Sequence, residues 1–346
     1  MNFTEYAACD GLALADLIAR GEVTVAEVTA CAQAAIDDRN PQLNAVLTDL
    51  DGQAYANNKP FSGIPFLIKE LVLTAAGAKS RGGSRSTPDL PAPADTNLMA
   101  AYRQAGLHLI GTTQTPEMGY NATTETVAFG PVHNPWKTGH SAGGSSGGSG
   151  AAVAAGLVPI AHANDGGGSI RIPARFCGIY GLKPSFGRVP YYPPSAVEPL
   201  SHAGPMTRTV RDAALMLSAI AGPFEKDRNT LPADTNDYNA VVDENINGLK
   251  IAWSPDLGYA NVDPEVAVHG GEYILRADET FSGFCALRVG FADDLSAPDA
   301  ASGNGCTKYV RIVVATTGIV DLGATAELAP GDDHDIVVKT AFVEVL

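Results

Sequence analysis

The sequence predicts an α/β protein in which helices cover a β-sheet. Helical and strand-like patterns alternate along the first 250 residues or so, an order typical of such folds. With 346 residues, 45% of them hydrophobic and 18% charged, the chain can bury a large core. Two segments dense in glycine and serine lie within 137–172 and enclose an apolar stretch, 151–160, suited to burial. We interpret these segments as sites of close backbone approach rather than as a flexible linker.

The first predicted elements are one helix and two strands. Thr24 and Glu27 form a capping-box pattern, which predicts a helix that runs to about Asp38. Residues 43–50 alternate enough to form a strand. Residues 63–69 read as a mostly buried strand that ends on a lysine.

The pattern then continues with further helices and strands. We expect Asp95 to cap a helix, and a strand to follow over 107–112. Pro116 is expected at the first position of another short helix. An amphipathic helix is predicted over 209–222 and a strand over 249–253.

Charge is distributed unevenly and suggests a domain boundary. Residues 1–224 carry 17 acidic and 15 basic side chains, whereas residues 225–346 carry 21 acidic and 8 basic ones. From about residue 268 the chain becomes rich in β-branched residues and acidic turns, which predicts strands. We therefore predict a domain over 1–267, with its core at 63–222, and an acidic, strand-rich segment over 268–346. The net charge of −15 argues against a nucleic-acid partner.

Composition also narrows the setting and the chemistry. No apolar run reaches the length of a membrane helix, and the N-terminus shows no basic region typical of a signal peptide. The five cysteines lack zinc-binding spacing, and we expect free thiols in a reducing cytoplasm. The seven histidines also lack metal-ligand spacing, so no metal is expected. The first glycine-rich segment matches a dinucleotide-binding motif only weakly, so no organic cofactor is expected either.

Lys69 and Ser169 are the first candidates for chemistry. A lysine at a buried strand end must be paired or neutral, unless its side chain extends to the surface. Ser169 follows the glycines 166–168, whose N–H groups are typical of an oxyanion hole beside a nucleophile. A serine nucleophile needs a base, and a desolvated lysine can serve.

Four motifs resemble the amidase signature family of serine hydrolases. They are GIPFLIKE, SAGGSSGGSGAAVAAG, NDGGGSIRIPARFCGIYGLKPSFGRV and GPMTRTVRDAALML, in the order typical of the family. The resemblance implies a mixed sheet with helices on both faces and a Ser–cis-Ser–Lys triad. By position, Lys69 is the base, Ser145 the cis-serine and Ser169 the acylated nucleophile. The resemblance also implies an oxyanion hole formed by the N–H groups of Gly166, Gly167, Gly168 and Ser169.

Other matched residues are expected to support the site. Asp165 and Arg171 are expected to fix the nucleophile loop by hydrogen bonds or an ion pair. Ser146 and Ser149 are expected either to orient Ser145 or to cap the helix over 147–156. We interpret Cys177 as a small buried residue.

The resemblance covers about 12–266 and, in the segments NDGGGSIRIPA and PFLIKEL, is similar to amidases related to 6-aminohexanoate-cyclic-dimer hydrolase. Family members usually run well past 400 residues, so the C-terminal part is interpreted as atypical or truncated. A divergent C-terminal region with the same strands is the competing interpretation, which limited proteolysis would separate from a foreign tail.

The expected activity is hydrolysis of a linear or cyclic carboxamide through an acyl-serine intermediate. The expected partner is a small amide substrate, with no membrane and with a homodimer as one possibility. Two alternatives stay open. One is the glutaminase-type component of a tRNA-dependent amidotransferase, and the other is a non-catalytic remnant or binding module.

Overall fold

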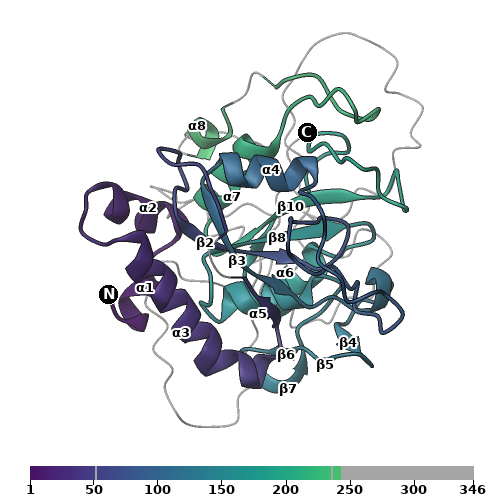
Figure 1. The fold of residues 1–346 in the computed structure, drawn as a ribbon, viewed down its shortest axis with the longest axis horizontal. Coiled ribbons are helices and arrows are strands. Elements are labelled where there is room, and N and C mark those ends of the chain that lie inside the picture. Colours follow the sequence, from purple (N-terminus) through teal and green to yellow (C-terminus); the bar gives the residue numbers. More distant parts are fainter. Residues whose placement is uncertain (51–52, 235–236, 243–346) are drawn as a thin grey trace, which may run out of the picture.

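One six-stranded mixed sheet forms the centre of the protein in the computed structural model, which describes residues 1–50, 53–234 and 237–242 (Figure 1). Its helices are α1 (Phe3–Ala8), α2 (Gly11–Ala19), α3 (Val25–Leu43), α4 (Asn97–Gln104), the 3₁₀ turn η1 (Glu117–Gly119), α5 (Gly147–Ala154), α6 (Arg171–Cys177), α7 (Val210–Ile220) and α8 (Tyr238–Val242). The strands of the sheet are β1 (Val46–Asp49), β2 (Ile64–Lys69), β3 (Leu107–Thr113), β8 (Ile160–Asp165), β9 (Tyr180–Gly181) and β10 (His202–Thr207). Two small hairpins complete the fold, and they are β4 (Glu125–Thr126) with β5 (Gly130–Pro131) and β6 (His133–Asn134) with β7 (Lys137–Ser141).

The sheet order is β1-β3-β2-β8-β10-β9. The central strands β3, β2 and β8 run parallel, while β1, β10 and β9 pair antiparallel with their neighbours. Helices α5 and α6 pack on one face and α4 and α7 on the other (Figure 1). The predicted α/β class, mixed sheet and two-sided helical cover are therefore confirmed.

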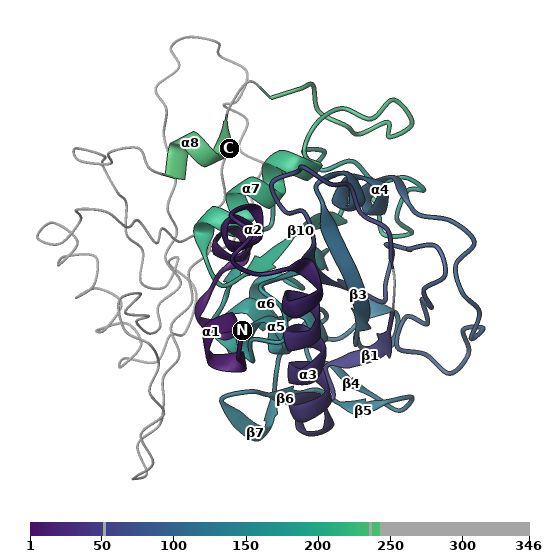
Figure 2. The same ribbon diagram turned by 60° about the vertical axis from the view of Figure 1, so that its left-hand side comes forward.

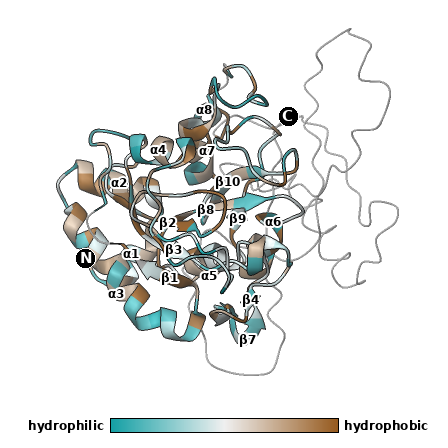
Figure 3. Ribbon diagram, turned by 45° about the vertical axis from the view of Figure 1, so that its right-hand side comes forward, coloured by the Kyte–Doolittle hydropathy of each residue, from teal (hydrophilic) through white to brown (hydrophobic). Residues whose placement is uncertain are grey.

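The long helix α3 lies beside the sheet, and the two hairpins lie at one end of the molecule, beyond the end of α3 (Figure 2). The N-cap of α3 is Thr24, as the capping box predicts. The Thr24 hydroxyl accepts from the Glu27 N–H, and the Glu27 carboxylate accepts from the Thr24 N–H. Along α3, hydrophobic and hydrophilic residues alternate in Figure 3, as in an amphipathic helix with one buried side. The helix continues five residues past the expected end at Asp38.

Two expected helix starts are wrong in detail. Thr96, not Asp95, caps α4, because its hydroxyl accepts from the Met99 N–H. The Asp95 carboxylate instead binds the Arg103 guanidinium and the Ala76 N–H. Pro116 lies before the 3₁₀ turn η1 rather than inside a helix, with an extended backbone.

Strand β10 and helices α1 and α2 were not predicted from the sequence. Strand β10 contains Gly204 and Pro205, residues that argue against a central strand, yet it pairs along its whole length with β8. Helix α1 has a capping box of Asn2 and Glu5, and Asp10 caps α2, so these two signals were present in the sequence. The predicted strand at 249–253 and the segment 268–346 lie outside the described residues.

The glycines of α5 allow the helix to pack directly against neighbouring backbone. A Cβ atom added at Gly148 would lie 2.6 Å from the Gln114 carbonyl oxygen and 2.7 Å from that of Ala45. Such distances leave no room for a side chain. The close-approach interpretation of this segment is confirmed, and a linker is excluded because α5 is buried.

We expect Gly148→Ala to lower the free energy of unfolding by about 3 kcal/mol, because overpacking against rigid backbone cannot relax easily. Urea unfolding of the full chain measures this loss. Gly167→Ala is the matched control for stability, since no atom lies within 4 Å of its added Cβ. Equal stability of the two variants would contradict the packing argument.

Candidate active site

A cavity of about 500 Å³ lies where two parallel strands end. Lys69 ends β2 and Asp165 ends β8, so both residues lie at the carboxyl edge of the sheet. Ser145, Asn164 and Ser169 line the cavity. The other lining residues are mostly small or apolar, namely Leu71, Val72, Met118, Gly119, Tyr120, Asn121, Ala122, Gly144, Gly166, Gly167, Ile172, Ser195, Ala196, Val197, Leu200 and Ser201.

Lys69 is fully buried and its amino group contacts three side-chain oxygens. Its Nζ lies 2.7 Å from Ser145 Oγ, 3.0 Å from Ser146 Oγ and 2.6 Å from Asn164 Oδ1. The side chain therefore points into the site and does not extend to the surface, which decides between the two interpretations of Lys69.

Burial lowers the pKa of Lys69 from 10.5 to about 7, although the negative charge of Asp165 acts in the opposite direction. Removal from water penalises the charged ammonium more than the neutral amine. At neutral pH a large fraction of Lys69 is thus a free amine, which can accept a proton.

Ser145 lies in the first glycine-rich loop, after a cis peptide bond between Gly144 and Ser145. The Ser146 N–H donates to the Ser169 carbonyl oxygen at 3.2 Å, so the two glycine-rich loops contact each other directly. Residues 143–147 also fit the G-x-S-x-G pattern of Ser-His-Asp hydrolases. The basic side chain that contacts Ser145 Oγ is Lys69, however, and not a histidine.

Asp165 organises the second loop, which carries Ser169. Its buried carboxylate accepts from the Gly168 N–H at 2.7 Å and the Ile170 N–H at 3.0 Å. It also pairs with the Arg171 guanidinium through two contacts of 3.0 Å. Burial alone would raise the pKa of Asp165, but the Arg171 contacts and the two N–H groups hold the pKa below its usual value. The carboxylate is therefore charged and fixes the loop.

One of the four expected oxyanion-hole donors is engaged by a neighbouring side chain. The Gly168 N–H donates to the Asp165 carboxylate at 2.7 Å. The N–H groups of Gly166, Gly167 and Ser169 have no acceptor within the described ranges. Gly166 and Gly167 are exposed and Ser169 is partly exposed, which leaves these three as candidate donors.

The neighbouring serines do not cap α5, because no side chain caps this helix. Ser146 Oγ contacts Lys69 and donates to the Asn164 carbonyl oxygen at 3.2 Å. Ser149 Oγ donates to the His162 carbonyl oxygen and so joins α5 to β8. Cys177 is fully buried, and burial raises the pKa of its thiol, consistent with a packing role.

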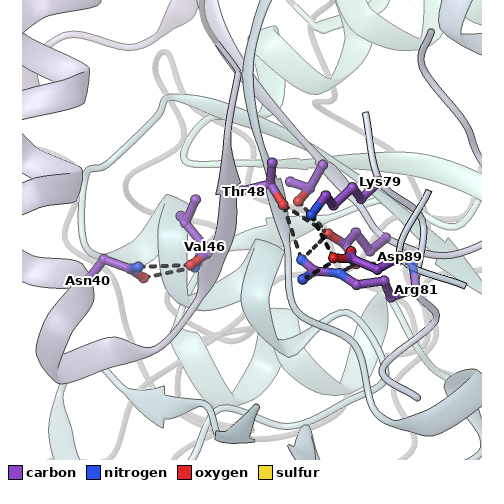
Figure 4. Close-up of polar contacts among 8 residues, drawn as sticks. Asn40, Val46, Thr48, Lys79, Arg81 and Asp89 are labelled. Atoms are coloured by element: carbon purple, nitrogen blue, oxygen red, sulfur yellow. Dashed lines mark hydrogen bonds and ion pairs between the residues drawn. The ribbon is translucent and has the colours of Figure 1, made fainter. Parts of the chain in front are cut away.

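Glu70, the residue after Lys69, anchors the end of β2. Its buried carboxylate accepts from the Arg81 guanidinium at 2.8 and 3.1 Å and from the Thr112 hydroxyl at 2.7 Å. Arg81 also donates to Thr48 of β1, and Figure 4 shows Arg81 beside Thr48 and Asp89. These contacts link β1, β3 and the end of β2 next to Lys69.

Asn164 is the contact of Lys69 that the sequence analysis missed. It lies directly before Asp165 on β8 and makes the shortest of the three lysine contacts. A buried lysine needs acceptors, and β8 runs parallel to β2 with Asn164 near its end, but spacing alone did not reveal which oxygens would face it.

In the described part of the chain, His, Cys, Asp and Glu side chains form no group of three or more suited to a metal ion. The same residues include no helix long and apolar enough to span a bilayer. The three cysteines described, Cys9, Cys31 and Cys177, are free.

Comparison with known proteins agrees with the motifs. The amidase family profile matches residues 13–272. An acylamidase from Rhodococcus erythropolis is 40% identical over 245 residues, which cover 67% of this chain and 51% of that protein. The A subunit of a glutamyl-tRNA(Gln) amidotransferase from Alkalilimnicola ehrlichii is 37% identical over 266 residues, covering 73% and 55%. The chain thus spans about half the length of the curated relatives it matches.

Comparison with solved structures also finds amidases. The structure of 6-aminohexanoate cyclic dimer hydrolase complexed with substrate superposes with a TM-score of 0.71 at 34% identity, covering 79% of this chain and 59% of that one. The resemblance to such amidases is confirmed, and the matched span includes both glycine-rich loops and Lys69. This chain belongs to the amidase signature family.

Proposed function

We propose that the protein hydrolyses carboxamides through an acyl-Ser169 intermediate. The observation that carries this proposal is the buried Lys69 amine, 2.7 Å from Ser145 Oγ, because Ser145 and Ser169 both line the cavity. A nucleophile, a relay hydroxyl and a base with a lowered pKa are the groups that acyl transfer needs.

In this mechanism Ser169 Oγ attacks the amide carbonyl carbon, and its proton passes through Ser145 to Lys69. The negative oxygen of the tetrahedral intermediate accepts from N–H groups of Gly166, Gly167 and Ser169. Lys69 returns the proton through Ser145 to the leaving nitrogen as the C–N bond breaks. Water then attacks the Ser169 ester and releases the carboxylic acid.

The cavity favours uncharged, largely apolar amides as substrates. Among its described residues are Leu71, Val72 and Ile172, and none of the described residues that line it is charged. The charged amino-acid groups of glutamine would lose hydration there without an ionic partner. This observation favours the acylamidase and cyclic-dimer hydrolase relatives over the glutaminase alternative.

Amide turnover with hydroxylamine trapping tests the function. We expect the full chain to release aniline from a neutral acyl anilide, or to open the ring of the cyclic dimer of 6-aminohexanoate, at least tenfold faster than it releases ammonia from L-glutamine. Hydroxylamine should divert the acyl group to a hydroxamate, because an acyl ester reacts with this nucleophile. Faster turnover of glutamine would favour the glutaminase alternative, and absence of any turnover or trapping would favour a binding module.

A further inference from the structure

Asn164 lies in a fixed orientation against the Lys69 amine. Its Oδ1 accepts from Lys69 Nζ at 2.6 Å, and its Nδ2 donates to the Leu71 carbonyl oxygen at 3.0 Å. A carbonyl oxygen can only accept, so the Leu71 contact decides which end of the amide faces the lysine. The oxygen of Asn164 is therefore an obligatory acceptor for a lysine N–H.

Ser146 is a second obligatory acceptor. Its hydroxyl proton is committed to the Asn164 carbonyl oxygen at 3.2 Å, so its oxygen lone pairs face Lys69 Nζ at 3.0 Å. A neutral lysine has two N–H bonds and one lone pair. Asn164 and Ser146 engage both N–H bonds, and the lone pair is left for the third contact, Ser145 Oγ.

We propose that Asn164 is a positioning residue that, together with Ser146, aims the lone pair of neutral Lys69 at the Ser145 hydroxyl. The inference rests on the proposed function, in which Lys69 is the base. An amine free to rotate would spend part of its time with an N–H toward Ser145, an arrangement that cannot accept the proton. Fixing the two N–H bonds removes those arrangements, and protonation of Lys69 then reverses a single hydrogen bond.

The charged and titratable groups around Lys69 leave this geometry intact. Asp165 on β8 is paired with Arg171 of α6, and its carboxylate is engaged by the loop. His162 on the same strand is fully buried. Its burial, and to a smaller extent the positive charge of Lys69, lower the pKa of His162 to about 3, so its ring is neutral. Glu70 binds Arg81. None of these groups makes one of the three Nζ contacts.

The pH dependence of Ser169 labelling by a fluorophosphonate tests the inference with two variants of opposite sign. In Asn164→Asp, full reactivity requires removal of the lysine proton beside a new negative charge, so the half-maximal pH should rise by about one unit or more. In Asn164→Leu, the buried ammonium loses an acceptor and its charged form is disfavoured. The half-maximal pH should then fall, with a maximal rate reduced about tenfold or more because the lone pair is no longer aimed.

Asn40→Asp is the matched control. Asn40 is a partly buried amide whose Nδ2 donates to the Val46 carbonyl oxygen and whose Oδ1 accepts from the Val46 N–H (Figure 4). It does not line the cavity that Ser145 and Asn164 line. The new charge there should leave the half-maximal pH unchanged. If either Asn164 variant keeps the wild-type half-maximal pH, or if both shift in the same direction, Asn164 does not position the amine.

Failure of the proposed function gives a different result. If Lys69→Met were labelled at Ser169 with the wild-type pH profile, Lys69 would not be the base, and the whole scheme would be wrong. If instead labelling depends on Lys69 but either Asn164 variant keeps the wild-type half-maximal pH, only the positioning role is overturned. Each Asn164 variant has its own expected direction, so one folded variant is sufficient.

Discussion

Ser169→Ala should abolish covalent labelling by a fluorophosphonate and lower amide hydrolysis by about 10⁴-fold or more, the scale of loss of a serine nucleophile. In the proposed mechanism, the Oγ atom of Ser169 forms the acyl ester, so its removal leaves no group for the acyl transfer. Ser145 is almost fully buried and engaged by Lys69, whereas Ser169 is partly exposed on the cavity. The experiment is mass spectrometry of the labelled full chain.

Ser195→Ala is the matched control, because Ser195 also lines the cavity but its hydroxyl accepts from the nearby Val197 N–H, away from Lys69. This variant should label at the wild-type rate. Peptide mapping separates the two serines of the proposed triad. An adduct on Ser145 in the wild-type chain would reverse their assigned roles, and undiminished labelling of Ser169→Ala would exclude Ser169 as the nucleophile.

Capping patterns in the sequence predicted the helix starts that depend only on neighbouring residues. The capping box at Thr24 and the hydroxyl of Thr209 start α3 and α7 where expected, since each satisfies a backbone N–H within the next turn. The start of α4 was misplaced by one residue, because Asp95 and Thr96 are both good caps and a distant contact with Arg103 decides between them.

The candidate site shows the same limit. The resemblance to the amidase signature family grouped Lys69, Ser145 and Ser169, although 76 residues separate the first two. It did not show that Gly168 would give its N–H to Asp165, or that Asn164 would face Lys69. Both contacts depend on how the end of β8 turns into the loop, and a sequence of glycines carries little information about that geometry.

The reaction should accelerate as pH rises through about 7, because the active form of Lys69 is the neutral amine and its pKa lies near this value. Below pH 7, kcat/KM should fall about tenfold per pH unit, provided that acylation limits the rate. Lys69→Met should lose nearly all activity, and its residual activity should not show this fall below pH 7. Lys69→Arg should be equally inactive up to pH 10, since a guanidinium keeps its proton.

Stability provides a readout of the same pKa that needs no substrate. The pKa of Lys69 is about 10.5 in the unfolded chain and about 7 in the folded protein. Between pH 7 and 10 the unfolded state therefore binds more protons, so stability should rise with pH by about 1.4 kcal/mol per unit from this group, and this gain should disappear as pH falls through 7. Urea unfolding at pH 7 and pH 9 should show this slope in the wild type relative to Lys69→Met.

The two measurements together locate any error. A flat activity profile with the stability slope present would mean that Lys69 is neutral at pH 8 but that proton transfer does not limit the rate. If both were flat, Lys69 would be charged in the folded protein at neutral pH, and the proposed base would be wrong. An activity midpoint near pH 7 together with the stability slope above pH 7 would assign the catalytic proton to Lys69, which is fully buried at the end of β2.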